Sequence, residues 1–346
     1  MPERPRLTPA IADLRRATRA ALTDVTADAL VLVALSGGPD SLALAAALAF
    51  EAPRAGLRAG ALIVDHGLQQ GSADVAARAA RQAEQLGLAP VRVLRVEVGA
   101  TGGPEAAART ARYAALERAA SELGAAAVLL AHTLDDQAET VLLGLTRCSG
   151  AASLQGMAAV RPLDSGGGVY RRPLLGIRRA ATVQACADAG LDPWTDPQIA
   201  DPAFSRVRVR QTVLPVLERE LGPGVAEALA RTAEQLREDS EALDAMAEEV
   251  AEDLADHAEA GISLDARALA ANPPALRQRL IRYVVASEFG VALSRAQTLE
   301  VARLVTDWHG QAGVDLPGIR AVRRDGRLLF EARDGGAGEG APDGTA

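Results

Sequence analysis

The hexapeptide SGGPDS at residues 36–41 places two hydroxyls, two glycines and one carboxylate between two apolar runs. Glycines permit positive φ, so successive backbone N–H groups of this turn can point inward and surround an anion. The carboxylate of Asp40 repels a phosphate directly, but it fits a Mg²⁺ ion that bridges it to phosphates. The complete hexapeptide favours this phosphate site over a tight turn in which Ser or Asp caps a helix. The residues predicted to bind ATP here are Ser36, Gly37, Gly38, Pro39, Asp40 and Ser41.

Further polar residues follow other apolar runs of the chain. Asp65 and His66 end a second run and are predicted to line the nucleotide pocket, with a turn around a hydrogen-bonded histidine as the alternative. His132 is left open between a nucleotide contact and the end of a strand. Asp136 and Glu139 lie three residues apart at a helix start. Their spacing fits a D-x-x-E capping box and a carboxylate pair around a substrate ammonium equally well.

Short apolar runs that alternate with Ala-rich helical patterns must position these residues. The expected strands cover residues 30–35, 60–67, 91–98 and 125–133, and the expected helices begin at Ser41 or cover 72–87, 105–124 and 134–145. This alternation predicts βαβ units and a doubly wound parallel sheet of the α/β class. The ATP-binding candidates and the acidic pair then lie near the carboxyl ends of strands, where open α/β sheets bind ligands.

The remainder of the chain predicts a smaller, mainly helical second domain. Residues 150–215 are irregular and rich in Gly, Pro and Arg, whereas helical periodicity covers 225–260 and continues to about 310. Asp325-Gly326 marks the turn of a hairpin within residues 313–332. We expect a catalytic domain at 1–215, a mainly helical domain at 216–334 that ends in this hairpin, and a disordered Gly-rich tail at 335–346.

All 37 basic side chains are arginine. The absence of lysine excludes a GxxxxGK[ST] phosphate loop and any enzyme that uses a lysine nucleophile.

The net charge is −8, but residues 277–327 carry 9 arginines against 5 acidic residues, so a nucleic acid would have to contact selected faces. The two cysteines lack metal-ligand spacing, and the sequence has neither an apolar run of membrane length nor a secretory pattern. These features predict a cytoplasmic protein without a membrane contact.

SGGPDS resembles the SGGxDS loop of the PP-loop ATP pyrophosphatases, which cleave ATP to AMP and pyrophosphate while they adenylate a carbonyl oxygen. Further stretches resemble the tRNA(Ile)-lysidine synthases of that superfamily and cover most of residues 30–220 in family order. These stretches are VDHGLQ (64–69), EAAARTARYAAL (105–116), AHTLDDQAETVLLGLTRCSGAASLQGM (131–157), RRPLLGIRRA (171–180) and RVRVRQTVLPVLE (206–218). The part that ends near DLPGIRAVRRDGRLLFE is similar to the family's first C-terminal domain, and the further C-terminal domain of longer members is expected to be missing.

The resemblance implies a ligase that uses ATP and Mg²⁺ to join L-lysine to C2 of the first anticodon cytidine of the isoleucine tRNA with a CAU anticodon. AMP and pyrophosphate are released, and the tRNA changes from methionine to isoleucine specificity. Asp136 and Glu139 are then expected to bind lysine, with Asp136 also catalytic, and Asp40 and Asp135 are expected to bind the metal.

The same resemblance gives roles to arginines. Arg109 or Arg112, which share one helical face with Tyr113, is expected to neutralise charge on the transferring phosphate, and the choice between them is open. The residues expected to contact tRNA phosphates are Arg171, Arg172, Arg178, Arg206, Arg208 and Arg210. The sequence does not decide whether the protein forms a homodimer.

Two departures and two rival functions accompany this interpretation. Ile199 and Val207 stand where asparagines are common in the family, which leaves the loop or tRNA geometry there open.

One rival is another PP-loop enzyme, either a tRNA thiolase or an ammonia-using synthetase. A thiolase conventionally needs a CxxC pair, whereas Cys148 and Cys186 are far apart. The other rival is a non-catalytic protein that binds ATP or tRNA.

Overall fold

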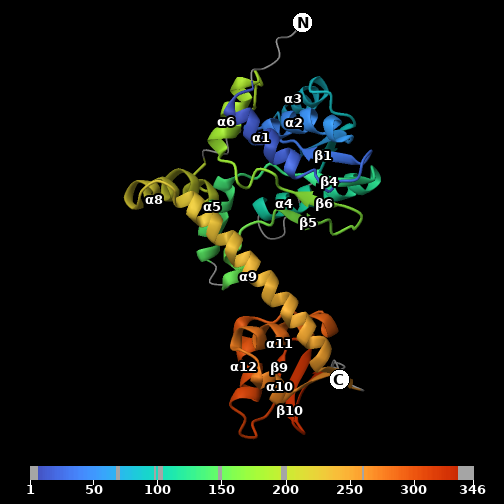
Figure 1. The fold of residues 1–346 in the computed structure, drawn as a ribbon, viewed down its shortest axis with the longest axis vertical. Coiled ribbons are helices and arrows are strands. Elements are labelled where there is room, and N and C mark those ends of the chain that lie inside the picture. The colour runs from blue at the N-terminus through green and yellow to red at the C-terminus, as the bar shows by residue number, and fades with distance from the viewer. Residues whose placement is uncertain are drawn as a thin grey trace, which may run out of the picture. The chain divides into compact units, whose positions relative to one another are not determined.

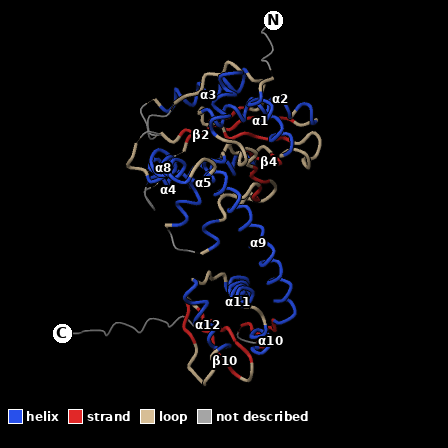
Figure 2. Tube along the Cα trace, turned by 60° about the vertical axis from the view of Figure 1, so that its left-hand side comes forward, coloured by secondary structure: helices blue, strands red, loops and turns tan. Residues whose placement is uncertain are grey.

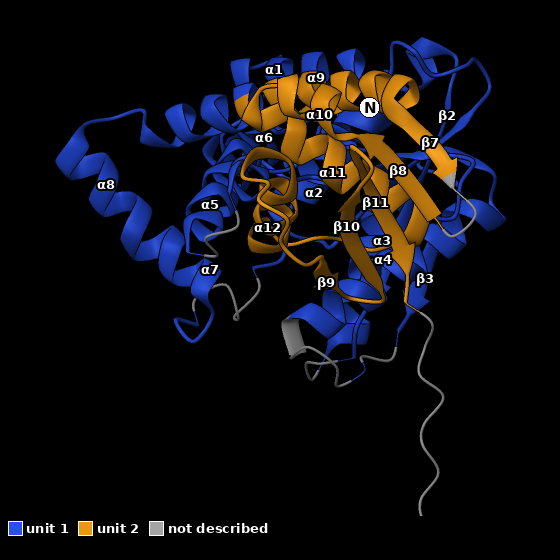
Figure 3. Ribbon diagram, turned by 90° about the horizontal axis from the view of Figure 1, so that it is seen from below, with its two compact units in different colours: residues 1–235 blue, residues 236–346 orange. Residues whose placement is uncertain are grey.

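The computed structural model describes residues 7–67, 71–96, 99, 104–146, 150–195, 201–258 and 261–333. The chain divides into two compact units, residues 1–235 and 236–346 (Figure 3). This division falls inside one long helix, later in the chain than the domain boundary predicted at residue 215. Cys148, Ile199 and the predicted tail at 335–346 lie outside the described residues.

A six-stranded sheet lies at the centre of the first unit (Figure 1). Its strands in spatial order are β3 (Val91–Arg95), β2 (Arg58–Asp65), β1 (Leu30–Ala34), β4 (Ala125–Leu129), β6 (Val169–Arg171) and β5 (Val160–Pro162). The first five strands are parallel, and β5 pairs antiparallel with β6. The predicted parallel α/β sheet is therefore confirmed. The strand order reverses between β1 and β4, and this is the point at which such sheets form a ligand crevice.

Helices cover both faces of this sheet. α1 (Pro9–Ala20), α2 (Pro39–Glu51), α3 (Ser72–Gln85) and α6 (Arg179–Asp188) pack on one face, and α4 (Pro104–Glu122) packs on the other. Alternate residues of β1 serve the two cores, because Val31 and Val33 join the first and Leu30 and Leu32 join the second. Burial on both faces explains why this strand appears in the sequence as a continuous apolar run.

The segment predicted to be irregular, residues 150–215, contains more regular structure than expected. β5 and β6 have three residues each, which is too short for a periodic sequence signal, and α6 follows them. The chain continues through α7 (Ser205–Arg208), the π-helical turn η4 (Val209–Val213) and α8 (Leu214–Leu221). α5 (Leu134–Leu145) contacts both α7 and η4. Within the described ranges, the short 3-10 turns are η1 (Pro53–Ala55) and η2 (Ala151–Leu154).

The second unit has its own core and an antiparallel five-stranded sheet (Figure 2). Its strands in spatial order are β7 (Ala255–Ala258), β8 (Gly261–Asp265), β11 (Arg327–Ala332), β10 (Ile319–Arg324) and β9 (Val314–Leu316). Its helices are the end of α9 (Val225–Leu254), α10 (Ala266–Ala271), α11 (Pro274–Phe289) and α12 (Arg295–Thr306). No helix in the described ranges is long and apolar enough to cross a membrane.

Two local predictions for the second unit have different outcomes. The hairpin is confirmed, because Arg324 pairs with Arg327 across a turn in which Asp325 has φ 50° and Gly326 has φ 78°. The helix predicted to cover 225–260 was too long, since α9 ends at Leu254 and the next four residues pair with β8. Sheet pairing overrides the local helical pattern at this point.

Candidate active site

The hexapeptide forms the turn between β1 and α2. Gly37 has φ 84°, and Gly38 is the N-cap of α2, so Pro39 occupies the first helical turn. The Ser41 hydroxyl accepts from the Ser36 N–H at 3.1 Å and lies 3.0 Å from the Ser36 hydroxyl. These bonds shape the turn, while the start of α2 supplies the partial positive charge that favours an anion.

Residues from two distant segments fix this turn from outside. The backbone N–H of Trp194 donates to the Gly37 carbonyl at 2.9 Å. Arg78 and Gln82 of α3 each donate to the Asp192 carbonyl at 2.8 Å, which holds the segment before Trp194. Trp194 is half-buried, and its backbone lies against the turn at residues 36–41.

Asp40 lies in the first turn of α2 and faces α6. Its carboxylate accepts from the Thr182 hydroxyl and from Arg179 Nε, the latter at 3.3 Å. Burial raises the pKa of Asp40, although the Thr182 hydroxyl and the Arg179 charge act in the opposite direction. A second cation beside Asp40 would therefore stabilise its ionised form.

Asp136 and Glu139 lie near the start of α5. Thr133 is the N-cap, and Asp136 Oδ2 accepts from the Thr133 N–H at 2.8 Å and from its hydroxyl at 2.9 Å. The capping box is thus Thr133–Asp136, and the Asp136–Glu139 box considered from the sequence is wrong. Asp136 Oδ1 and both oxygens of Glu139 remain for other partners, although Glu139 is 0 % exposed.

Arginines from three other positions surround this acidic pair. Arg179, the first residue of α6, donates to Asp136 at 2.7 Å and to Glu139 at 3.2 Å. Arg210 of η4 donates to Glu139 at 2.7 and 3.0 Å and to Asp136 at 3.4 Å. Arg206 of α7 lies 3.9 Å from Asp136 and 3.7 Å from Glu139.

These contacts keep Asp136 and its closest arginine charged. Burial acts to raise the pKa of Asp136, but the Arg179 charge and the Thr133 N–H outweigh it and lower the pKa. Burial acts to lower the pKa of Arg179, but the charges of Asp136, Glu139 and Asp40 raise it above its usual value. Arg179 therefore joins the turn after β1 to the acidic pair on α5.

The neighbouring side of the site carries positive charge. Burial lowers the pKa of His132 to about 3, and nearby Arg172, Arg112 and Arg109 add to this effect while Asp136 opposes it. His132 Nδ1 accepts from Arg172 Nε at 3.3 Å, so the neutral ring carries its proton on Nε2. Arg109 and Arg112 form no ion pair with a described residue. This group of cations suits an anion.

Asp65 and His66 follow β2 on the same side of the sheet. Asp65 is buried and accepts from the Gly67 N–H at 3.0 Å, so it shapes the turn after β2. His66 Nδ1 is buried and has no hydrogen-bond partner among the described residues. Burial lowers the pKa of His66, with the Arg112 charge as the next cause. His66 is consequently a neutral group with an unused polar atom beside the cations.

The six arginines predicted to contact tRNA occupy different environments. Arg171 forms a bidentate pair with Asp24 at 2.5 and 2.9 Å, and Arg172 is 7 % exposed and donates to the Ala158 carbonyl at 2.7 Å. Arg178 pairs with Asp135 at 3.1 Å and with Glu227 at 2.8 Å. These contacts favour structural roles for the three. Arg208 is exposed, whereas Arg206 and Arg210 point to the acidic pair.

Local geometry bears on two further positions. Asp135 accepts from the Arg179 backbone N–H at 2.7 Å and pairs with Arg178, so it supports the start of α6 and is poorly placed to bind a metal. Val207, at a position where asparagine is common in the family, is buried. An apolar side chain suits a buried position.

Arg179, Thr133 and Thr182 are site residues that were not predicted individually. Arg179 lies within the segment 171–180, but its importance depends on α6 beginning at that residue. A helix start after residues 174–177 was the available signal, because the first N–H groups of a helix lack partners within the helix and attract acidic side chains.

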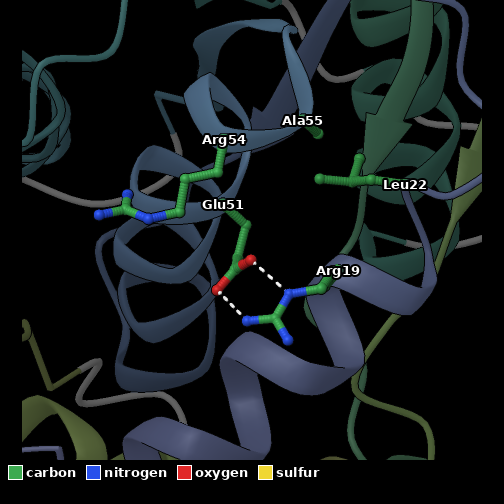
Figure 4. A pocket seen from close by; sticks show the side chains of 5 residues that line it. All are labelled: Arg19, Leu22, Glu51, Arg54 and Ala55. Atoms are coloured by element: carbon green, nitrogen blue, oxygen red, sulfur yellow. Dashed lines mark hydrogen bonds and ion pairs between the residues drawn. The ribbon is translucent and has the colours of Figure 1, made fainter.

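A separate cavity of about 360 Å³ lies away from these residues (Figure 4). It is lined by Arg19, Leu22, Glu51, Arg54 and Ala55. Glu51 is buried and accepts from Arg19 at 2.8 and 3.0 Å, so its charge is already paired. None of the predicted site residues lines this cavity.

Comparison with known proteins finds one family match in each unit. Residues 12–217 match the family described as the PP-loop domain, and residues 264–329 match the TilS substrate binding domain. The tRNA(Ile)-lysidine synthase of Leifsonia xyli subsp. xyli is 65% identical, over 87% of this chain and 90% of that protein. The chain belongs to the tRNA(Ile)-lysidine synthase family. The family member of Thermobifida fusca is 52% identical over 94% of this chain and 98% of its own length.

Membership in the lysidine synthase family confirms the predicted enzyme class, a ligase that forms lysidine in an isoleucine tRNA. Use of ATP is consistent with its PP-loop domain. The U34-tRNA thiolase NcsA of Methanococcus maripaludis shares the fold, with a TM-score of 0.56 and 20% identity over 66% of this chain and 80% of that chain.

Proposed function

We propose that the crevice between β1 and β4 binds ATP, L-lysine and the CAU-anticodon isoleucine tRNA, and joins lysine to C2 of the first anticodon cytidine. The observation that supports this most is the link through Arg179. Its guanidinium donates to Asp40, which belongs to the turn at residues 36–41, and to Asp136 and Glu139. A polyphosphate at the turn and an amine at the acidic pair would then lie on either side of one guanidinium.

In this proposal the triphosphate binds along the turn from Ser36 to Ser41. Its phosphates meet the N–H groups at the start of α2, and His66 Nδ1 offers its unused polar atom to the nucleoside part. Arg109 and Arg112, whose charges act on His132, would neutralise charge on the transferring α-phosphate. These are the roles predicted from the sequence, and they stay predictions.

Mg²⁺ fits this arrangement through one carboxylate. No cluster of three or more metal-ligating side chains occurs in the described ranges, and Asp40 is the acid that remains at the turn. Mg²⁺ commonly binds through one or two carboxylates together with phosphates and water. Bound between Asp40 and the phosphates, the ion would offset negative charge on the leaving pyrophosphate.

The reaction then has two displacements. The cytidine C2 oxygen attacks the α-phosphate, and the bond to pyrophosphate breaks. The lysine ε-amine next attacks C2, and the bond from C2 to the oxygen that carries AMP breaks while the amine loses a proton. Asp136 and Glu139 would orient the amine for that attack, since two carboxylates in a buried position select a cationic side chain.

Asp40→Asn tests the metal and phosphate part of this proposal. The purified protein is incubated with ATP, Mg²⁺, each labelled amino acid in turn and a CAU-anticodon isoleucine tRNA transcript. We expect acid-stable label on the RNA with lysine alone, and a loss of at least about 100-fold in pyrophosphate release for Asp40→Asn. Glu220→Gln, an exposed acid on α8, is the control and should retain activity. Full activity of Asp40→Asn would contradict the proposal.

A further inference from the structure

The hydrogen-bond acceptors of the acidic pair are almost fully used within the described part of the chain. A carboxylate has about four lone-pair positions on its two oxygens. Asp136 accepts from Thr133 twice, from Arg179 at 2.7 Å and from Arg210 at 3.4 Å. Glu139 accepts from Arg179 once and from Arg210 twice. A substrate ammonium, with three donors, does not find three acceptors here unless a guanidinium leaves.

The charges lead to the same conclusion. Asp40, Asp136 and Glu139 are matched by Arg179, Arg206 and Arg210, so three carboxylates already face three guanidinium groups. Glu139 is fully buried, and a further cation beside it would add uncompensated positive charge where solvent screens poorly. Lysine binding therefore requires one arginine to withdraw from the pair.

Arg210 is the arginine whose withdrawal provides the right number of acceptors. It uses two acceptor positions on Glu139 and one on Asp136, which equals the three donors of an ammonium group. Arg179 also donates to Asp40 and is the first residue of α6, so its withdrawal would disturb the turn at residues 36–41. Arg210 lies instead on the π-helical turn η4, a geometry that frequently marks functional sites.

We propose that Arg210 determines when the amine site is open: its guanidinium occupies the position of the lysine ε-ammonium and exchanges with it. This inference rests on the proposed function, because it concerns the lysine site of that reaction. An RNA phosphate provides the alternative partner for the displaced guanidinium, which is the contact first predicted for Arg210. Lysine and tRNA binding are then coupled, and each increases the affinity for the other.

Equilibrium dialysis of labelled L-lysine against the full chain, without RNA or ATP, tests this exchange. Arg210→Gln should bind lysine at least about tenfold more tightly than the unaltered protein, since the internal competitor is gone. Arg219→Gln, an exposed arginine on α8, is the matched control and should leave lysine affinity unchanged. Equal or weaker lysine binding by a folded Arg210→Gln would overturn the proposal.

A second measurement uses the unaltered protein and so does not depend on how the variant folds. Addition of the CAU-anticodon tRNA transcript without ATP should tighten lysine binding, and Arg210→Gln should reduce that gain. If the affinity for lysine is the same with and without tRNA, the exchange is overturned. The proposed function still stands in that case, provided that lysine is incorporated into the RNA. Absence of any lysine binding or incorporation with tRNA present removes the proposed function and the exchange together.

Discussion

At the scale of single residues, His132 shows how burial fixes a protonation state in this site. Its pKa is lowered to about 3 from 6.5, first by burial and then by neighbouring arginines. The ring is therefore neutral at every pH at which the protein is expected to work. Its Nδ1 can accept from Arg172 without interruption, and it adds no positive charge beside the acidic pair.

This shift predicts a dependence of stability on pH. Below pH 6.5 the unfolded chain binds a proton at this histidine that the folded protein does not, so stability falls as pH decreases from 6.5 toward 3. His132→Asn removes this contribution, and between pH 7 and pH 5 it should lose about 2 kcal/mol less stability than the parent protein. Urea unfolding followed by Trp194 fluorescence in a Trp308→Phe background measures it. Parallel pH profiles would contradict the prediction.

Asp136 shows what local sequence pattern can reveal about a single residue. The sequence offered a helix cap and an ammonium ligand as alternatives, whereas the structure uses Oδ2 for the cap and Oδ1 for arginines. One carboxylate can thus serve the Thr133 capping box and hold a cation at the same time, although the cap is not the Asp136–Glu139 box suggested by the sequence. Its partner Arg179 lies 43 positions away, and no periodicity or capping rule connects residues at that separation.

At the scale of elements, the turn between β1 and α2 depends on a left-handed glycine. Gly37 has φ 84°, and a Cβ there would meet neighbours at ordinary contact distances, the nearest at 3.6 Å. The cost of a side chain is therefore backbone strain. Gly87, after the C-terminus of α3, has the same φ of 84° and open space around it.

Gly37→Ala and Gly87→Ala form a matched pair. Each should lose about 1 kcal/mol of stability, because both force an L-residue into the left-handed region. Only Gly37→Ala should also reduce pyrophosphate release, since it redirects the N–H groups proposed to hold the phosphates. Thermal unfolding and a pyrophosphate assay separate the two effects. An equal loss of activity in Gly87→Ala would show that strain alone explains the result.

Strands β1, β2 and β4 of the first sheet were predictable because burial on both faces leaves continuous apolar runs. β5, β6 and β7 were not, because they have three or four residues each and depend on pairing with strands that are distant or follow a turn. The parallel core therefore follows from sequence periodicity, whereas the short strands depend on tertiary pairing that local pattern does not contain.

At the scale of the whole molecule, the chain contains separate cores. Leu44 is buried in a core of the first unit, and Phe330 is buried in the core of the second. The two matched families also fall in different parts of the chain, at residues 12–217 and 264–329. A destabilising substitution in the core of one unit should consequently affect the binding properties of that unit first.

Phe330→Ala tests this independence. Loss of a fully buried aromatic ring should destabilise the second unit by about 3–5 kcal/mol. We expect tRNA binding and lysidine formation to fall while ATP binding, measured without RNA, remains near the level of the parent protein. Leu44→Ala is the reciprocal variant and should weaken ATP binding. Equal loss of ATP binding in both would show that the cores are not independent.

The arginines around Asp136 and Glu139 have a chemical consequence for the proposed reaction. An adenylated base is open to attack by any neutral amine within reach, and a protein amine would compete with the substrate from an effectively permanent position. Guanidinium groups stay protonated at all accessible pH values and do not act as nucleophiles. A chain whose 37 basic side chains are all arginine can hold these acids and the RNA without offering a side-chain amine of its own, so self-inactivation by a covalent protein–RNA link from a basic side chain is avoided.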